Sequence, residues 1–314
     1  MSSPVTDLSG RRVWVAGHRG MVGSAIVRRL SAENCEILTV ERGALDLRRH
    51  DDVDAYVAAQ RPDVVILAAA KVGGILANDT YPADFLLDNL LVETSVVSAC
   101  YKNSVKKLTF LGSSCIYPRE APQPMPESAL LTGPLEPTNE WYAVAKIAGI
   151  KLCQAFRRQH GCDYISAMPT NLYGPNDNFD LASSHVLPAL IAKAHAAKQA
   201  GARDFVVWGS GSPLREFMHV DDCADAIVFL TKHYSGEEHV NVGTGEEVTI
   251  RQLANIVMEA VGLQAELVFD AAKPDGAPRK LMDSTRLRGL GWRDRISLKE
   301  GVSSTYAHYL RSAV

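Results

Sequence analysis

Tyr142 and Lys146 are the residues of this chain best suited to proton chemistry, because they lie four positions apart in a helical pattern. This spacing places both side chains on one face of a helix, within reach of each other. A phenol near pKa 10 is a weak acid at neutral pH, and a nearby ammonium favours the phenolate. The pair can therefore exchange a proton with a carbonyl or alcohol oxygen while the ammonium holds a cofactor ribose.

Ser113 supplies a second polar group directly after the apolar segment 107–111. Such a segment predicts a buried strand, and open α/β sheets bind their ligands where the strands end. The Ser113 hydroxyl can then hydrogen-bond a substrate oxygen beside the Tyr142 phenol. Taken singly, Ser113 also fits a turn residue and Tyr142 a core aromatic, so the interpretation depends on the order Ser, Tyr, Lys.

A glycine-rich turn near the start of the chain predicts a dinucleotide site. Gly17, Gly20 and Gly23 follow an apolar segment and open a helical pattern. Glycines permit a tight turn, close approach of a pyrophosphate to backbone N–H groups, and close packing of helix and strand. The spacing alone is a weak signal, with a plain strand–helix turn as the alternative. Followed by the Ser, Tyr and Lys, it indicates a nicotinamide-dependent enzyme.

The second predicted strand is followed by Glu41 and Arg42, which favour different cofactors. An acidic residue at this place holds the ribose diol of NAD, whereas an arginine holds the extra phosphate of NADP. Arg19, within the glycine turn, adds a second positive charge near the same place. We therefore predict NADP(H), with solvated surface arginines as the alternative.

Strand-like segments alternate with helical patterns through the first half of the chain. This order predicts an α/β fold of the Rossmann type, a doubly wound parallel sheet with helices on both faces. The predicted strands are 12–17, 37–40, 64–69, 107–111 and 164–168, with the sheet resuming near 217–220 and 240–242, and the predicted helices are 22–31, 51–60, 83–102, 141–160 and 186–198. Six prolines make 118–137 an extended loop.

The length of 314 residues predicts two domains. We expect a nucleotide-binding domain in residues 1–174 with a return segment at about 216–246, and a smaller α/β substrate lobe in 175–215 and 247–314. Hydrophobic residues make up 46% and charged residues 22%, as in ordinary globular proteins. The net charge of −3 provides no basic surface for nucleic acid or an acidic membrane.

Cysteine usage and hydropathy favour a cytoplasmic protein. Residues 1–12 lack the apolar core of a signal peptide, and the apolar segment 64–70 is too short to span a bilayer. The six cysteines include no C-x-x-C pair, which argues for reduced thiols and against a disulfide framework or a zinc site. We expect no metal, no nucleic-acid partner and no membrane partner.

Together these motifs resemble those of the extended short-chain dehydrogenase/reductases. Segments 68–75, 112–118, 169–175 and 273–276 further resemble the GDP-L-fucose synthases of that family, and the likeness extends from Arg12 to about Tyr309. The resemblance implies a bifunctional, NADPH-dependent enzyme. It would epimerise GDP-4-keto-6-deoxy-D-mannose at C3 and C5 and reduce C4, giving GDP-L-fucose.

The resemblance also implies that Cys115 and His185 transfer the protons of the epimerisation. C3 and C5 both flank a carbonyl, so inversion proceeds through an enolate, with a base on one face and an acid on the other. A thiol near pKa 8.5 and an imidazole near 6.5 suit this work at neutral pH. Ser113 and Tyr142 would stabilise the same oxygen in both reactions. Which of Cys115 and His185 takes the proton stays open, and a lone cysteine is usually a small buried hydrophobe.

Binding residues follow from the same resemblance. The residues implied for the cofactor are Gly17, His18, Arg19, Gly20, Met21, Val22, Gly23, Arg42, Leu111, Gly112, Ser113, Ser114, Lys146, Pro169, Thr170, Asn171, Leu172 and His185. For the nucleotide sugar, Lys193 and Arg215 would meet the phosphates, Trp208 the base or ribose, and Asp275 a polar group. Each of these four also has an ordinary structural interpretation, and guanine rests on the resemblance alone.

Two structural roles are expected outside the site. His219 would link the two lobes rather than take part in catalysis. Helices 83–102 and 141–160 carry apolar residues on their exposed faces and would form the interface of a homodimer, as in the family that the chain resembles.

Two other functions stay open at this point. A 4-epimerase or 4,6-dehydratase of the same superfamily would keep its cofactor bound and return the hydride to the substrate. A dehydratase would also need a carboxylate pair where this chain has Cys115 and Ile116. A non-catalytic dinucleotide sensor would tend to lose the Tyr or the Lys, and both are present.

Overall fold

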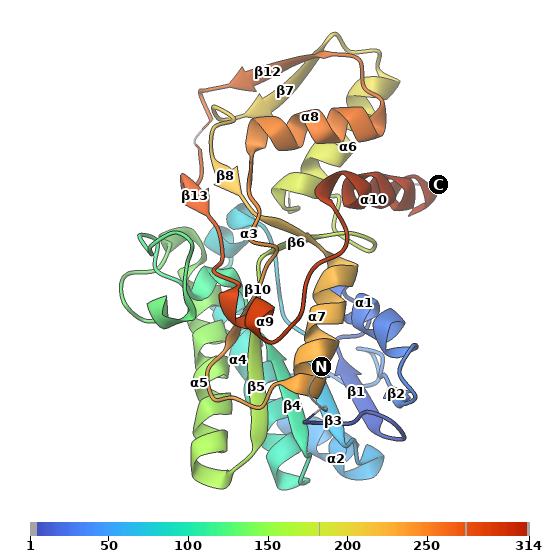
Figure 1. The fold of residues 1–314 in the computed structure, drawn as a ribbon, viewed down its shortest axis with the longest axis vertical. Coiled ribbons are helices and arrows are strands. Elements are labelled where there is room, and N and C mark those ends of the chain that lie inside the picture. The colour runs from blue at the N-terminus through green and yellow to red at the C-terminus, as the bar shows by residue number, and fades with distance from the viewer. Residues whose placement is uncertain (1–4, 182, 274, 313–314) are drawn as a thin grey trace.

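A six-stranded parallel sheet forms the centre of the lower part of the molecule (Figure 1). The computed structural model describes residues 5–181, 183–273 and 275–312. The strand order is β10-β5-β4-β3-β1-β2, and all pairings are parallel. The strands are β1 (Arg12–Ala16), β2 (Glu36–Leu38), β3 (Val64–Leu67), β4 (Lys107–Leu111), β5 (Asp163–Pro169) and β10 (Val240–Val242).

Helices cover both faces of this sheet, with α2 (His50–Gln60), α4 (Pro82–Lys102) and α5 (Glu140–His160) on one face, and α1 (Met21–Leu30) and α7 (Val220–His233) on the other. The short α3 (Ile75–Thr80) precedes α4. Val96 of α4 and Ile26 of α1 belong to two separate apolar cores, one on each face. This arrangement confirms the predicted doubly wound α/β fold.

The predicted elements of the first half differ from the observed ones by at most two residues at either end. The prediction that residues 217–220 continue the central sheet is wrong. Strand β9 (Phe217–His219) instead pairs with β6 (Asn171–Tyr173) in a separate two-stranded sheet. The physical reason is that β5 already has a partner on each side, β4 and β10, so it offers β9 no free edge.

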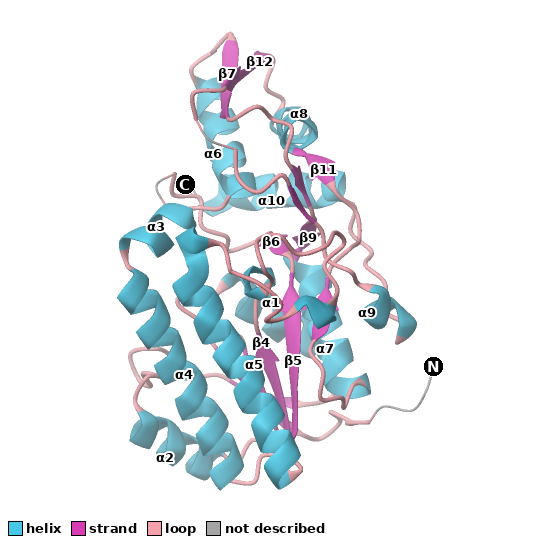
Figure 2. Ribbon diagram, turned by 90° about the vertical axis from the view of Figure 1, so that its left-hand side faces the viewer, coloured by secondary structure: helices cyan, strands magenta, loops and turns pink. Residues whose placement is uncertain are grey.

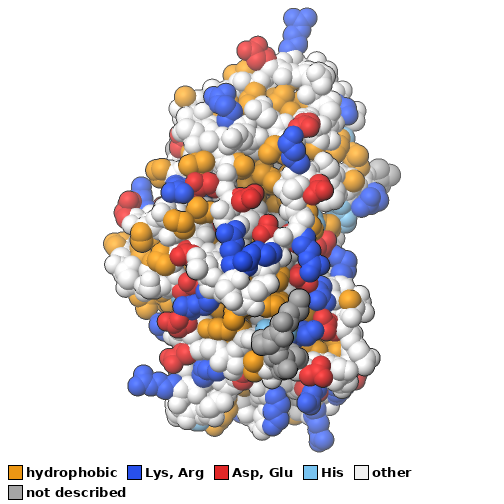
Figure 3. All heavy atoms as spheres, in the orientation of Figure 1, with side chains coloured by type: hydrophobic (Ala, Val, Ile, Leu, Met, Phe, Trp, Pro, Cys, Tyr) orange, Lys and Arg blue, Asp and Glu red, His pale blue; other side chains and the backbone are white. Residues whose placement is uncertain are grey.

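The remaining elements form a smaller lobe above the sheet in Figure 1. Its helices are α6 (Val186–Gln199), α8 (Ile250–Val261) and α10 (Leu298–Ser312), and its strands are β7 (Asp204–Trp208), β8 (Leu214–Arg215), β11 (Val248–Thr249), β12 (Glu266–Asp270) and β13 (Arg279–Lys280). Ile191, Leu253 and Val302 lie in its apolar core. On the face shown in Figure 3, acidic and basic side chains are intermixed.

The chain crosses between the two parts more than once. Met282 packs in the core under α4 and α5, while Leu287 of α9 (Thr285–Gly289) and Trp292 pack in the core with α1 and α7. These residues lie within the segment 247–314 that the sequence assigns to the second lobe. The division at the predicted boundaries stays a prediction. No helix within the described ranges combines the length and apolarity needed to cross a bilayer.

A buried carboxylate fastens the upper lobe to the sheet. Glu216 is fully buried and accepts hydrogen bonds from Gly245 N at 2.7 Å and Met282 N at 3.0 Å. Burial raises the pKa of Glu216, and these two N–H donors oppose the rise. Asn171 Nδ2 donates to Glu216 O at 2.8 Å, so the same residue also holds the start of β6.

Replacing this carboxylate should destabilise the fold. In Glu216→Gln an amide NH₂ would face a backbone N–H donor, which should lower the free energy of unfolding by about 1–3 kcal/mol. Urea unfolding followed by circular dichroism measures the change. Glu246→Gln, at an exposed position nearby, is the control and should change stability by less than about 0.5 kcal/mol. Equal stability of Glu216→Gln and the unchanged protein would contradict the fastening role.

Candidate active site

The predicted catalytic residues meet where β4 ends and α5 begins. Ser113 and Cys115 follow β4, with Cys115 in the short 3₁₀ helix η1 (Ser114–Ile116), and Tyr142 and Lys146 lie in the first two turns of α5. The Ser113 Oγ accepts a hydrogen bond from Cys115 N at 3.4 Å and so caps this turn. Because α5 packs against η1, residues far apart in the sequence form one cluster.

The surroundings of Tyr142 favour the protonated form of its phenol. Burial raises the pKa of its phenol well above the ordinary value, negative charge at Cys115 and Glu93 raises it further, and Ser113 opposes the rise. The ring packs edge-on against Phe85, with centroids 6.4 Å apart. A phenol with a raised pKa is protonated at neutral pH, which is the state a proton donor needs.

The Lys146 ammonium is buried and held by two groups. It donates a hydrogen bond to Leu111 O at 3.1 Å, and it lies 3.1 Å from Glu93 Oε1. It also sits 4.7 Å from the Phe110 ring centroid and 5.9 Å from that of Tyr142. Glu93 was not among the predicted site residues. The available signal was an acidic residue on the buried, mostly apolar face of α4.

Cys115 and His185 approach the site from different lobes. Burial raises the pKa of the Cys115 thiol, while the positive charges of Lys280 and Lys146 oppose the rise. His185 lies directly before α6 and stays open to solvent, although neighbouring atoms crowd around it. This partial desolvation lowers the pKa of its imidazole, and the charge of Lys280 lowers it further. Lys280 thus acts on both members of the predicted pair.

Lys280 is the second site residue that sequence reasoning missed. It lies on β13, whose pairing with β8 sets Lys280 beside Arg215. Burial lowers the pKa of the Lys280 ammonium, and the neighbouring Cys115 opposes this change. No local motif could have revealed the residue, because its place depends on the pairing of two strands from separate parts of the chain.

The glycine turn leaves room for a phosphate group. A Cβ at Gly23 would collide with Gly17 O, and one at Gly17 would lie 2.7 Å from the Ala69 backbone, so both glycines serve close packing. A Cβ at Gly20 would meet no atom closer than 3.6 Å. Helix α1 begins there without a side-chain cap, which leaves backbone N–H groups for an anion. His18, Arg19, Met21 and Val22 complete the turn.

Glu41 is already paired within the protein. Its carboxylate lies 2.7 Å from Arg19 Nη1 and 3.4 Å from His18 Nε2, and these contacts lower the pKa of Glu41, with the Arg19 hydrogen bond as the main cause. Arg42 is exposed and forms no ion pair within 4.0 Å among the described residues, although its charge contributes to the lowered pKa of Asp46. Arg42, rather than Glu41, is therefore available to a ligand.

The ends of β4 and β5 lie side by side next to Lys146. Gly112 N donates to Ala167 O at 2.9 Å, and a Cβ at Gly112 would collide with Met168. Beyond β5, Thr170 N donates to Val242 O at 3.0 Å. The predicted segments 111–114 and 169–172 therefore form one edge with the catalytic cluster, where a nicotinamide could lie.

The residues predicted for the nucleotide sugar belong to the upper lobe. Lys193 Nζ lies 4.5 Å from the ring centroid of Trp208, whose indole is 61% exposed at the end of β7. Asp275 accepts hydrogen bonds from Ser210 N at 2.9 Å and Ser210 Oγ at 2.7 Å, which lower its pKa. Burial lowers the pKa of Arg215, and the charge of Asp275 opposes this change. An open stacking face thus lies close to positive charge.

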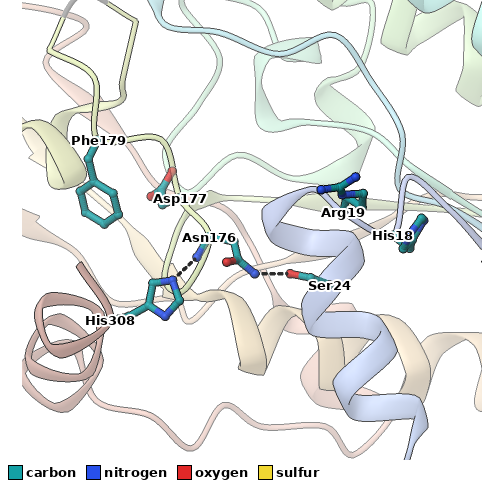
Figure 4. Close-up of a pocket in the computed structure, with 7 residues that line it drawn as sticks. All are labelled: His18, Arg19, Ser24, Asn176, Asp177, Phe179 and His308. Atoms are coloured by element: carbon teal, nitrogen blue, oxygen red, sulfur yellow. Dashed lines mark hydrogen bonds between the residues drawn. The ribbon is translucent and has the colours of Figure 1, made fainter. Parts of the chain in front are cut away.

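A cavity of about 580 Å³ lies beside the glycine turn (Figure 4). It is lined by His18, Arg19, Ser24, Asn176, Asp177, Phe179 and His308. Asn176 connects the two parts of the molecule across it, since its Nδ2 donates to Ser24 Oγ at 3.0 Å and its backbone N donates to His308 Nε2 at 3.2 Å. Burial raises the pKa of Asp177 to about 7. The Tyr142 cluster does not line this cavity.

His219 has the linking position expected from the sequence. Its Nδ1 accepts a hydrogen bond from Asp221 N at 3.2 Å and so caps α7, while Nε2 lies 3.4 Å from the Ser304 hydroxyl of α10. The ring also packs edge-on against Tyr173. The residue therefore joins helices of the two lobes.

Comparison with known proteins identifies the family. A model described as "NAD dependent epimerase/dehydratase family" matches residues 13–243. The chain is 62% identical to a probable GDP-L-fucose synthase 1 of Oryza sativa subsp. japonica, over 97% of this chain and 94% of the relative. It is 57% identical to a GDP-L-fucose synthase of Sinorhizobium fredii, over 98% of each.

Structural comparison agrees with the sequence matches. The crystal structure of a GDP-L-fucose synthetase from Naegleria fowleri bound to NADP superposes with a TM-score of 0.91 at 29% identity, covering 100% of this chain and 98% of that one. The chain therefore belongs to the NAD dependent epimerase/dehydratase family, the extended short-chain dehydrogenase/reductases, and to the branch that holds these GDP-L-fucose synthases.

Proposed function

We propose that this protein is an enzyme that epimerises GDP-4-keto-6-deoxy-D-mannose at C3 and C5 and reduces C4 with NADPH, producing GDP-L-fucose. The observation that supports the proposal is the cluster of Ser113, Cys115 and Tyr142 where β4 ends, with the charge of Lys280 acting on both Cys115 and His185. Tyr142 with Lys146 and Ser113 would form one proton-transfer system, and Cys115 with His185 from the other lobe would form the second. The names of the relatives support the same reaction.

The chain's own residues fit NADPH. The open space beside Gly20 would hold the pyrophosphate, and Lys146 with the segment 169–172 would hold the nicotinamide riboside. Arg42 would meet the 2′-phosphate, because Glu41 is engaged by Arg19. When bound, NADPH supplies a hydride to C4 of the sugar.

Cys115 and His185 would carry out the epimerisation. One removes the proton from C3 or C5, and the other returns a proton to the opposite face of the enolate. Ser113 and Tyr142 hydrogen-bond the enolate oxygen while it carries charge. The positive charge of Lys280 opposes the rise that burial causes in the pKa of the Cys115 thiol. Lys280 thereby favours the thiolate of Cys115, while the same charge keeps the His185 imidazole in its neutral, proton-accepting form.

Tyr142 would complete the reduction. Its phenolic O–H bond breaks and a new O–H bond forms at O4 as C4 accepts the hydride, and Ser113 holds the same oxygen. The product is an alcohol, so the neighbouring C–H bonds lose their acidity and the new configuration is fixed. Solvent then returns a proton to the phenolate.

The nucleotide part of the substrate would bind on the upper lobe. Arg215 and Lys193 carry positive charge for the pyrophosphate, and the exposed Trp208 indole offers a stacking face for the base. Asp275 would accept a hydrogen bond from the nucleoside or sugar. The six unpaired thiols fit a reducing cytoplasm.

We also propose that the protein is a homodimer. α4 and α5 lie side by side (Figure 2) and expose large apolar side chains. These are Leu87, Leu91, Tyr101, Trp141 and Val144. Contiguous exposed apolar surface marks an interaction site, and the same face of a second copy would cover it with a four-helix contact.

The activity is tested by mixing the protein with GDP-4-keto-6-deoxymannose and either NADPH or NADH, and by following the loss of reduced-nicotinamide absorbance. We expect rapid loss with NADPH and slower loss with NADH. Tyr142→Phe removes only the proton-donating hydroxyl and should slow reduction about 10²–10⁴-fold. Absorbance that stays constant with both cofactors would contradict the proposed function, and rapid turnover by Tyr142→Phe would contradict the proton-donor role.

Epimerisation is separable from reduction. Cys115→Ser replaces a thiol by a far weaker acid, so exchange of the substrate's C3 and C5 protons with deuterated water should slow by about 10²–10⁴-fold. Nuclear magnetic resonance of the substrate measures this exchange. NADPH affinity, measured by fluorescence, should change less than about twofold, since the fold is kept. Exchange at the unchanged rate would remove Cys115 from the mechanism.

The dimer is tested by light scattering. Leu87→Glu places a charge on the exposed face of α4, so the measured mass should fall from twice the chain mass to one chain mass. Leu310→Glu, an equally drastic change on exposed α10, should leave the dimer intact. A monomeric unchanged protein at micromolar concentration would refute the proposal.

A further inference from the structure

Glu93 places a buried negative charge beside the proposed catalytic pair. Its side chain is 1% exposed, and Oε1 lies 3.1 Å from Lys146 Nζ. Within the described ranges, neither carboxylate oxygen has a hydrogen-bond partner. Removing a carboxylate from water costs free energy unless an opposite charge is near. Burial raises the pKa of the Glu93 carboxyl, and the Lys146 ammonium opposes that rise and so favours the ionised form.

Helices α4 and α5 pack closely beside this carboxylate. A Cβ at Gly149, one turn after Lys146 on α5, would lie 2.8 Å from Glu93 Oε2 and would collide with the Phe110 ring. Glycine at this position therefore lets α5 approach α4 closely enough for the charges to meet. Phe110 covers the ammonium from the sheet side.

We propose that Glu93 is a positioning residue, which holds the Lys146 ammonium against Leu111 O and offsets its charge so that Tyr142 stays protonated for reduction. The inference rests on the proposed reductase function. A lone ammonium favours the phenolate, whereas an ammonium paired with a carboxylate carries no net charge. The electrostatics agree, since the charge of Glu93 is one cause of the raised pKa of Tyr142.

The direction of the reaction explains why this pairing is useful. Reduction starts from the phenol, whose O–H bond breaks as the substrate's O4 gains a proton and C4 gains the hydride. Oxidation of an alcohol would start from the phenolate instead. The Glu93–Lys146 pair therefore maintains the protonation state from which reduction begins.

The test is Glu93→Gln, which keeps the side-chain shape and removes the charge. Without the carboxylate the ammonium favours the phenolate, so the pKa of Tyr142 falls and the acid form is lost at lower pH. In the pH profile of the single-turnover rate, measured with saturating NADPH, the basic limb is the fall in rate at high pH. This limb should shift to lower pH by about one unit. Ultraviolet difference titration against Glu93→Gln/Tyr142→Phe, without substrate, should show tyrosinate absorbance starting at correspondingly lower pH.

Two matched variants separate charge from structure. Glu93→Asp keeps the carboxylate, so its basic limb should lie within about 0.3 pH units of that of the unchanged protein. Glu216→Gln also loses a buried carboxylate, but one that fastens the lobes elsewhere, so the limb should not move even though stability falls. A limb that shifts equally in Glu216→Gln would mean that any loss of a buried charge has this effect, and would overturn the proposal.

A double variant keeps the test open if Glu93→Gln does not fold. Glu93→Met with Lys146→Met removes both charges without leaving either one unpaired. Positions 93 and 146 together carry no net charge in either the unchanged protein or the double variant. The basic limb of the double variant should therefore lie within about 0.5 pH units of that of the unchanged protein. An upward shift of about one unit or more would show that Lys146 acts alone on Tyr142, and the proposal would be wrong.

The outcomes also separate this inference from the proposed function. If the unchanged protein fails to oxidise NADPH with the keto sugar, the proposed function is wrong, and the Tyr142 titration still decides the role of Glu93. If the protein is active but neither the limb nor the titration moves in Glu93→Gln, the inference alone fails.

Discussion

The ion pair between Glu93 and Lys146 constrains the part of the candidate active site that is built on β4 and α5. Two charges can be buried together only if they meet, so α4 and α5 must pack closely enough for the carboxylate to reach the ammonium. Gly149 makes that approach possible. The ammonium also bonds Leu111 O at the end of β4, which fixes α5 to the strand that carries Ser113 and Cys115. The position of Tyr142 follows from the same contacts.

The second lobe completes the site through a different set of buried bonds. Glu216, directly after β8, accepts a hydrogen bond from Met282 N, just after β13, and β13 carries Lys280, whose charge acts on Cys115. His185 enters from the start of α6 in the same lobe. The central sheet and its helices thus position Tyr142 and Cys115, whereas the second lobe positions His185.

Much of this arrangement was predictable because it depends on local spacing. The four-residue interval of Tyr142 and Lys146 requires one helix face, and the glycine turn requires a strand before it and a helix after it. Strand β9 was not placed correctly, because an apolar segment shows that a strand forms but not which edge is free to receive it. Glu93 and Lys280 were missed for a similar reason, since each acts through a residue distant in the sequence.

The sequence by itself determined the α/β fold, the glycine turn between a strand and a helix, and the family, and it supplied the candidates for the reactive side chains. Those properties are encoded in residue types and short intervals, which turns and helices translate directly into geometry. Only the tertiary structure decided the charge environment of those side chains. It paired Glu41 with Arg19 and Glu93 with Lys146, and it brought the charge of Lys280 near enough to Cys115 to affect the pKa of the thiol. Burial and through-space charge depend on which distant segments pack together, and no local pattern specifies that packing.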